Sequence, residues 1–127
     1  MRLLPLFQAP NLCALHALHA DLFPALLQSG GMGWDILFAS VSTQLWHTQA
    51  SMDSDDLFTR LNQLPLQPAP VLPAEWADLP FYGGWFFYAG YEELEKIEPR
   101  VSLQTLFACE FPRAALLRCP AAILHHV

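Results

Sequence analysis

The most distinctive stretch of the chain is Leu79-Pro-Phe-Tyr-Gly-Gly-Trp-Phe-Phe-Tyr-Ala-Gly-Tyr-Glu92. Two adjacent glycines, a run of aromatic residues and a third glycine indicate a buried strand that another stretch of backbone approaches closely. We therefore expect a Cβ atom at Gly83 or Gly84 to clash with its surroundings. The residues that form this structural motif are Gly83, Gly84, Gly90 and Tyr91.

The sequence before this stretch shows helix and strand signals in alternation. Asn11 is a good N-cap for a helix whose leucines recur at helical spacing and which ends at Pro24. The glycines of residues 30–33 indicate a turn, because glycine adopts positive φ at little cost. The further predictions are strands at 25–29, 34–39 and 45–48, and a helix with apolar positions at 57, 58, 61 and 64, capped by Asp53 or Ser54.

The sequence after residue 64 is punctuated by prolines. Residues 65–80 contain five of them, which predicts an extended connection instead of a helix or a central strand. The charged residues up to Pro99 predict one or two helical turns. Two strands, 113–118 and 121–127, are expected on either side of Pro120. Together these elements predict an α+β fold, and the length of 127 residues predicts a single domain over 1–127.

The composition limits the class of protein. Apolar residues make up 54% of the chain, which excludes a disordered protein. Charged residues make up only 14%, against about 25% in average domains, so we expect part of the surface to be hidden against another chain or another copy. The net charge of −6 with six Lys and Arg residues argues against a nucleic-acid partner.

The sequence also predicts the cellular compartment of the protein. The chain has no run of 18 apolar residues, so no membrane span is predicted. Polar residues interrupt the apolar start, which argues against a signal peptide. The odd number of cysteines, three, favours a reducing compartment. These observations predict a cytoplasmic protein without a membrane partner.

The residue pattern shows no catalytic constellation and no metal site. Gly30-Gly-Met-Gly33 lacks the Lys of a phosphate-binding loop, and no Ser lies in a nucleophile elbow. His125 and His126 point to opposite faces of their predicted strand, so they make a poor metal chelate. His16 and His19 are read as part of a polar helix face. The acidic residues between 92 and 98 are read as a solvated face.

The motif of residues 79–92 resembles a signature in the N-terminal region of component I of aminodeoxychorismate (para-aminobenzoate) synthase and anthranilate synthase, the chorismate-utilising enzymes. Upstream, Pro24–Ser29, a short loop, Asp35-Ile36 and Ala39 look like the aminodeoxychorismate branch. Residues 120–126 are similar to the strand that precedes the long insertion of the family. The resemblance covers nearly the whole chain, although only residues 79–92 are specific.

The resemblance implies a fold and an activity. The fold is part of two packed antiparallel sheets with outer helices. The whole enzyme converts chorismate and ammonia to 4-amino-4-deoxychorismate for p-aminobenzoate and folate synthesis. A glutamine amidotransferase subunit supplies the ammonia, and Mg²⁺ assists the departure of the hydroxyl group. The chorismate and magnesium site belongs to a C-terminal domain that this chain lacks, so the chain is expected to be a non-catalytic fragment without a cofactor of its own.

The resemblance also implies a tryptophan pocket. Ser29 corresponds to a serine that contacts tryptophan in the family, and Trp34 occupies the aromatic position before the aspartate, Asp35. The loop here lacks the Tyr-Ser-Arg contacts of the family. Two alternatives remain open, namely anthranilate synthase component I and a stand-alone small-molecule binding or regulatory module. The expected partners are the C-terminal domain, the amidotransferase subunit and a second copy of the fragment.

Overall fold

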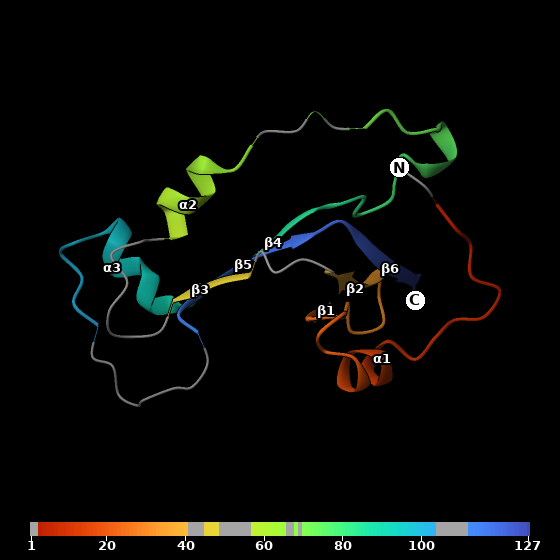
Figure 1. Cartoon of the computed structure of the whole chain (residues 1–127), viewed down its shortest axis with the longest axis horizontal. Coiled ribbons are helices and arrows are strands. Elements are labelled where there is room, and N and C mark those ends of the chain that lie inside the picture. The colour runs from red at the N-terminus through yellow and green to blue at the C-terminus, as the bar shows by residue number, and fades with distance from the viewer. Residues whose placement is uncertain (1–2, 41–44, 49–56, 66–67, 69, 104–111) are drawn as a thin grey trace. The chain divides into compact units, whose positions relative to one another are not determined.

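The structure is a computed structural model that describes residues 3–40, 45–48, 57–65, 68, 70–103 and 112–127, with the backbone alone described at 45–48. The described elements are three α-helices, two 3-10 turns and six strands (Figure 1). The helical elements are α1 (Leu12–Leu18), α2 (Leu57–Gln63), η1 (Ala74–Trp76), η2 (Tyr91–Glu93) and α3 (Leu94–Ile97). The strands are β1 (Ala25–Leu27), β2 (Trp34–Ala39), β3 (Leu45–Thr48), β4 (Gly84–Ala89), β5 (Ala114–Cys119) and β6 (Ala121–His126).

The strands form two small sheets. One has the order β1-β2-β6 and the other the order β3-β5-β4. β1 and β6 pair antiparallel with β2, and β3 pairs antiparallel with β5. The predicted α+β class is therefore confirmed. Pro120 alone separates β5 from β6, so the chain passes from one sheet to the other at this residue.

The chain divides into two compact units. The first comprises Met1–Thr43, Pro68–Trp85 and Arg118–Val127, and the second comprises Gln44–Gln67 and Phe86–Leu117. The division therefore falls within β4 and within β5.

The first unit is built around the sheet β1-β2-β6. Leu37 and Phe38 of β2 are buried, and the ring of Phe38 meets the edge of Phe81 at a centroid distance of 5.0 Å. Ser40 is buried as well, and its hydroxyl donates to the carbonyl oxygen of Arg118 at 2.8 Å. Leu37 and Phe38 thus place the central strand β2 in the core of this unit.

The second unit has its core on β5 and α2. Leu57 of α2 is fully buried, as is Ala114 at the start of β5. Leu116 and Leu117 are 4% and 8% exposed. β5 is flanked by a strand on each side, which explains why its side chains are the best covered in the described part of the sheet.

Several predicted boundaries agree with the structure and others do not. The predicted N-cap is confirmed, because the Asn11 side chain accepts from the Ala14 N–H at 3.0 Å. α1 ends at Leu18, however, instead of continuing to Pro24. A residue before proline avoids the helical conformation, and the carbonyl of His19 closes a turn by accepting from the N–H groups of Leu22 and Phe23.

A strand forms within residues 79–92, as predicted, but the prediction that it is buried was wrong. β4 is an edge strand of its sheet, so its side chains are half-buried or exposed, and Phe87 is 57% exposed. The proline-rich connection contains one turn of 3-10 helix, η1. Asp53 and Ser54, the predicted caps of α2, lie outside the described residues. All helices that the structure describes fall short of the length and apolar character needed to traverse a bilayer.

Candidate functional site

The structure brings Ser29 and Asp35 together at the loop end of the β1–β2 hairpin. Leu27 of β1 pairs with Ile36 of β2, so the chain reverses between them. Asp35 Oδ1 accepts the backbone N–H of Ser29 at 2.8 Å and the Ser29 hydroxyl at 3.0 Å. One carboxylate oxygen therefore fixes both ends of the loop.

The loop itself depends on glycine. Gly30, Gly31 and Gly33 have φ values of +70°, +93° and +104°, which L-residues with side chains rarely adopt. Beyond the adjoining residues, no described atom lies within 4 Å of a Cβ built at any of these three glycines. The predicted turn is thus confirmed, and the glycines are required by backbone conformation and not by crowding.

Trp34 does not share a sheet face with Asp35. Successive residues of a strand point to opposite faces, and the Trp34 ring meets His126 of β6 edge-on at 4.9 Å between centroids. Asp35 is instead paired in register with His125. The residues expected to form a tryptophan pocket therefore fall into two groups, Ser29 with Asp35 on one side and Trp34 with His126 on the other.

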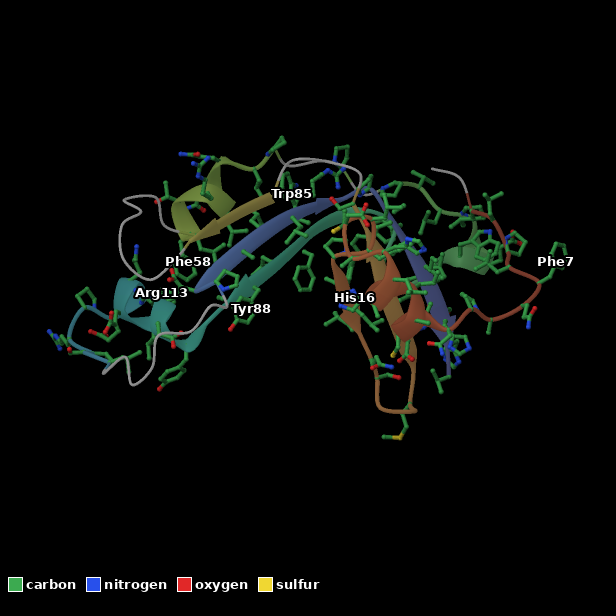
Figure 2. The ribbon with its side chains drawn as sticks, turned by 60° about the horizontal axis from the view of Figure 1, so that its bottom comes forward. Phe7, His16, Phe58, Trp85, Tyr88 and Arg113 are labelled. Carbon is green, nitrogen blue, oxygen red and sulfur yellow. The ribbon has the colours of Figure 1, made fainter. Side chains whose placement is uncertain are left out.

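The hydrogen bonds between Ser29 and Asp35 stabilise the turn. A serine nucleophile needs a base that takes its proton, whereas the hydroxyl of Ser29 donates to a carboxylate oxygen that already binds the amide of the same residue. His16 of α1 (Figure 2) has its Nδ1 2.7 Å from the carbonyl oxygen of Phe23.

The glycine motif lies at the two ends of β4. Gly83 has a φ of +105°, and a Cβ there would lie 3.3 Å from the carbonyl oxygen of Pro120. Gly90 is buried, and a Cβ there would lie 2.9 Å from the carbonyl oxygen of Arg113. At Gly84 the nearest atom is a side-chain carbon of Phe81 at 3.5 Å, an ordinary contact. The expected close approach of backbone is therefore found at Gly83 and Gly90, and Gly84 is free of it.

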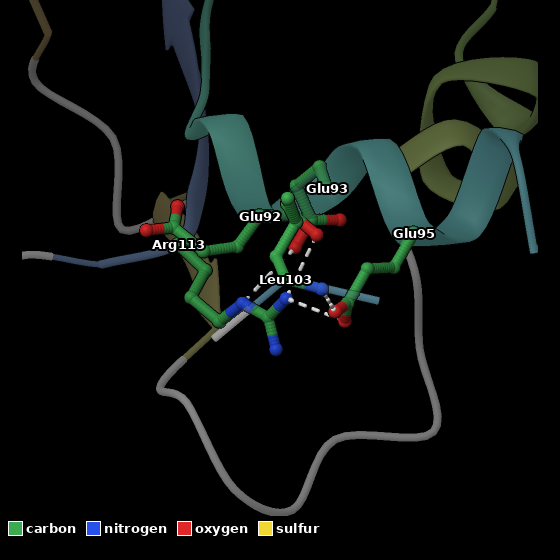
Figure 3. A network of polar contacts seen from close by, with 5 residues as sticks. All are labelled: Glu92, Glu93, Glu95, Leu103 and Arg113. Atoms are coloured by element: carbon green, nitrogen blue, oxygen red, sulfur yellow. Dashed lines mark hydrogen bonds and ion pairs between the residues drawn. The ribbon is translucent and has the colours of Figure 1, made fainter. Parts of the chain in front are cut away.

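A polar network lies just after β4 (Figure 3). Glu93 is 4% exposed, and its Oε1 lies 3.7 Å from Nε of Arg113, the residue before β5. The same guanidinium donates from Nη2 to the carbonyl oxygen of Glu92 at 2.9 Å and lies 3.7 Å from Glu95 Oε2. Glu95 Oε1 accepts the N–H of Leu103 at 2.6 Å.

This network corrects one reading of the sequence. The acidic residues after β4 were expected to form a solvated face, and Glu93 is instead buried against an arginine. Tyr91, the last residue of the motif, is 74% exposed beside it. The one signal in the sequence was an arginine directly before an apolar strand, 20 positions after Glu93, and such a separation does not show which acid the arginine meets.

A second arginine was also missed by the sequence reading. Arg118 of β5 donates from Nη1 to the carbonyl oxygen of Gly84, and its guanidinium lies 5.8 Å from the centroid of the Trp85 ring. An arginine over an indole face is a stabilising cation–π geometry. The motif tryptophan therefore helps to hold β4 against β5.

The described residues bring no three His, Cys, Asp or Glu side chains together in a way that could hold a metal ion. Comparisons of the chain with models of protein families, with curated proteins and with solved structures gave no match. The interpretation of function therefore depends on the sequence motif and on the contacts described above.

Proposed function

We propose that this chain is the N-terminal, non-catalytic portion of an aminodeoxychorismate synthase component I. In this proposal the whole enzyme replaces the 4-hydroxyl group of chorismate with ammonia, which gives 4-amino-4-deoxychorismate for p-aminobenzoate and folate synthesis. A glutamine amidotransferase subunit delivers the ammonia. The role of the present chain is to form part of the sheet framework on which a chorismate-binding domain packs.

The observation that carries this proposal is the use of the glycine motif. Gly83 and Gly90 stand at the two ends of β4, and each faces a backbone carbonyl at one end of β5, at Pro120 and Arg113 respectively. The Gly90 N–H also donates to the Arg113 carbonyl oxygen at 2.7 Å. A motif whose glycines join two strands is what a structural portion of the enzyme requires.

The proposal assigns no step of the reaction to the described residues. Two of their carboxylates are engaged in structural contacts, Asp35 with Ser29 and Glu93 with Arg113. Because these carboxylates do not converge, they do not suit Mg²⁺, which prefers several oxygen ligands in octahedral geometry. Chorismate and Mg²⁺ are therefore placed in the C-terminal domain in this proposal.

The gene downstream of Val127 gives the most direct test. A continuing reading frame with a Pro-Ile-Lys-Gly-Thr motif supports the aminodeoxychorismate branch. Alanine at the third position of that motif points to anthranilate synthase, and a stop codon directly after Val127 points to a stand-alone binding module. Either of the last two results contradicts the proposal.

A reconstitution experiment tests the role of the chain in the enzyme. The purified chain is incubated with chorismate, Mg²⁺ and ammonium, alone and with the C-terminal domain produced separately from the same gene. We expect product only when both parts are present. Gly90→Ala should weaken the reconstitution, whereas the matched variant Gly84→Ala should retain it. Turnover by the chain alone would contradict a non-catalytic role.

A further inference from the structure

β6 forms an edge of the sheet β1-β2-β6, and its sequence does not protect that edge. Within the described residues it pairs on one side only, with β2. Natural edge strands are usually guarded by charged side chains, prolines or bulges. β6 reads Ala-Ala-Ile-Leu-His-His and holds no acidic residue, lysine, arginine or proline. This strand is therefore available to pair with another one.

The hydrogen bonding of Val127, the residue after β6, shows which backbone groups of β6 face away from β2. The N–H of Val127 donates to the carbonyl oxygen of Gly33 at 2.8 Å. Because N–H and C=O groups of alternate residues point to the same side of a strand, residues 121, 123 and 125 also face β2. The backbone groups of Ala122, Leu124 and His126 consequently point away from β2.

This assignment agrees with the side-chain contact at the same end of the strand. Trp34 and His126 are opposite each other in the register and, by this assignment, do not hydrogen-bond to each other. In antiparallel sheets the side chains of such a pair approach most closely. Their rings are in fact in contact, with 4.9 Å between centroids.

The burial of β6 favours a partner beside the strand over a partner on one face of the sheet. Ile123 and Leu124 are neighbours and point to opposite faces. Both are only half-buried. A partner lying on one face would cover one of them, whereas an added strand flanks both.

We propose that β6 pairs antiparallel with β6 of a second copy of the chain, with Leu124 on the two-fold axis. Such an axis stands perpendicular to the sheet, so it pairs residues that point to the same face. Leu124 then faces the partner's Leu124, and Ala122 faces the partner's His126. The available N–H and C=O groups of the two strands satisfy one another in three residue pairs, each with two hydrogen bonds, or about six bonds in all.

The neighbouring register satisfies fewer groups. With Ile123 on the axis, His126 would face the partner's Pro120, which has no N–H to donate. The Leu124 register also places no charged residue opposite another one. A second copy in the Leu124 register thus satisfies the donors and acceptors of this edge without opposing like charges. The proposed pairing does not depend on the proposed function.

Molar mass measured by light scattering is the first test. The full chain at about 100 µM, where mass action favours association, should have twice the mass of 14.3 kDa. Ala122→Pro removes an N–H that does not bond β2, and proline is tolerated at such edge positions. By symmetry it removes two hydrogen bonds and should weaken the dimer by about 10- to 100-fold. The mass of a monomer at about 100 µM would overturn the proposal.

Cysteine cross-linking tests the register even if the proline variant fails to fold. In a background with Cys13 and Cys109 replaced by Ser, Leu124→Cys should form a disulfide-linked dimer under mild oxidation, because directly opposite Cα atoms lie about 5.5 Å apart. Ile123→Cys is the matched control, since the partner's Ile123 is offset from it by two residues. Equal cross-linking of both variants, or cross-linking of Ile123→Cys alone, would overturn the proposed register.

Discussion

β5 and β6 are consecutive strands of similar composition with different surroundings. β5 reads Ala-Ala-Leu-Leu-Arg-Cys and β6 reads Ala-Ala-Ile-Leu-His-His. Every residue of β5 except Arg118 is buried, whereas no residue of β6 is. β5 is the central strand of its sheet and β6 is an edge strand. The position of a strand in its sheet, and not its apolar content, therefore decides how much of it is covered.

The contacts around the two strands also differ in kind. Around β5, polar groups hold the strand in place, since Arg113 before it meets Glu93 and Arg118 within it binds the Gly84 carbonyl. Around β6 the contacts are with the hairpin end of β2, where His126 meets Trp34. Substitutions near β5 should consequently cost more stability than matched ones near β6.

The largest difference is expected at the fourth position of the two strands. Leu117→Ala in β5 removes a side chain that is 8% exposed, so it should lower the free energy of unfolding by about 2–4 kcal/mol. Leu124→Ala in β6 removes a half-buried side chain and should cost about 1 kcal/mol or less in the monomer. Denaturant unfolding of dilute protein measures both. Equal losses would show that β6 is covered as well as β5.

The next largest effects are expected at the glycines that adjoin β5. Gly83→Ala and Gly90→Ala should each cost about 1–3 kcal/mol, the first through strain at positive φ and the second through crowding against Arg113. Gly84→Ala is the matched control and should cost less than about 1 kcal/mol. Thermal and denaturant unfolding should rank the three variants in this way. A large loss at Gly84 would contradict the ordinary contact seen there.

A smaller effect is expected in the network before β5. Glu93→Gln removes the charge of the buried carboxylate that faces the half-buried Arg113 and should cost about 1–2 kcal/mol. Glu95→Gln, at a side chain that is 36% exposed, should cost less than about 1 kcal/mol. The two unfolding curves, compared at neutral pH, provide the measurement. Identical stabilities would mean that Glu93 is solvated, as the sequence had suggested.

The smallest effect is expected at the hairpin end beside β6. Ser29→Ala removes one hydrogen bond to Asp35 but retains the bond from the backbone N–H, so it should cost about 0.5–1.5 kcal/mol. The exposed Ser102 offers a control, and Ser102→Ala should leave the unfolding midpoint unchanged. A loss at Ser29 larger than that at Glu93 would reverse the ranking of the two regions.

The sequence predicted the positions of many elements because their signals are local. The structure has β2 at 34–39 and β3 at 45–48, as predicted. The Asn11 cap and the glycine turn after Ser29 are also confirmed, since a cap and a positive φ depend on one residue and its immediate neighbours.

The candidate site was predicted less well. The family resemblance groups Ser29, Trp34 and Asp35 in one tryptophan pocket, but strand geometry separates Trp34 from the other two. Gly83 and Gly84 were treated alike, although only Gly83 meets a backbone carbonyl. The burial of Glu93 was missed because its partner arginine lies 20 positions away.

The sequence by itself thus determined where strands, turns and the α1 N-cap form, and which stretch carries the family resemblance. The tertiary structure decided which strand is central, which glycine meets a neighbouring carbonyl and which carboxylate is buried. The physical reason is that local conformation depends on adjacent residues, whereas coverage depends on partners distant in the chain. β5 and β6 differ little in composition. The strands that flank them make β5 a buried central strand and leave β6 a half-exposed edge strand.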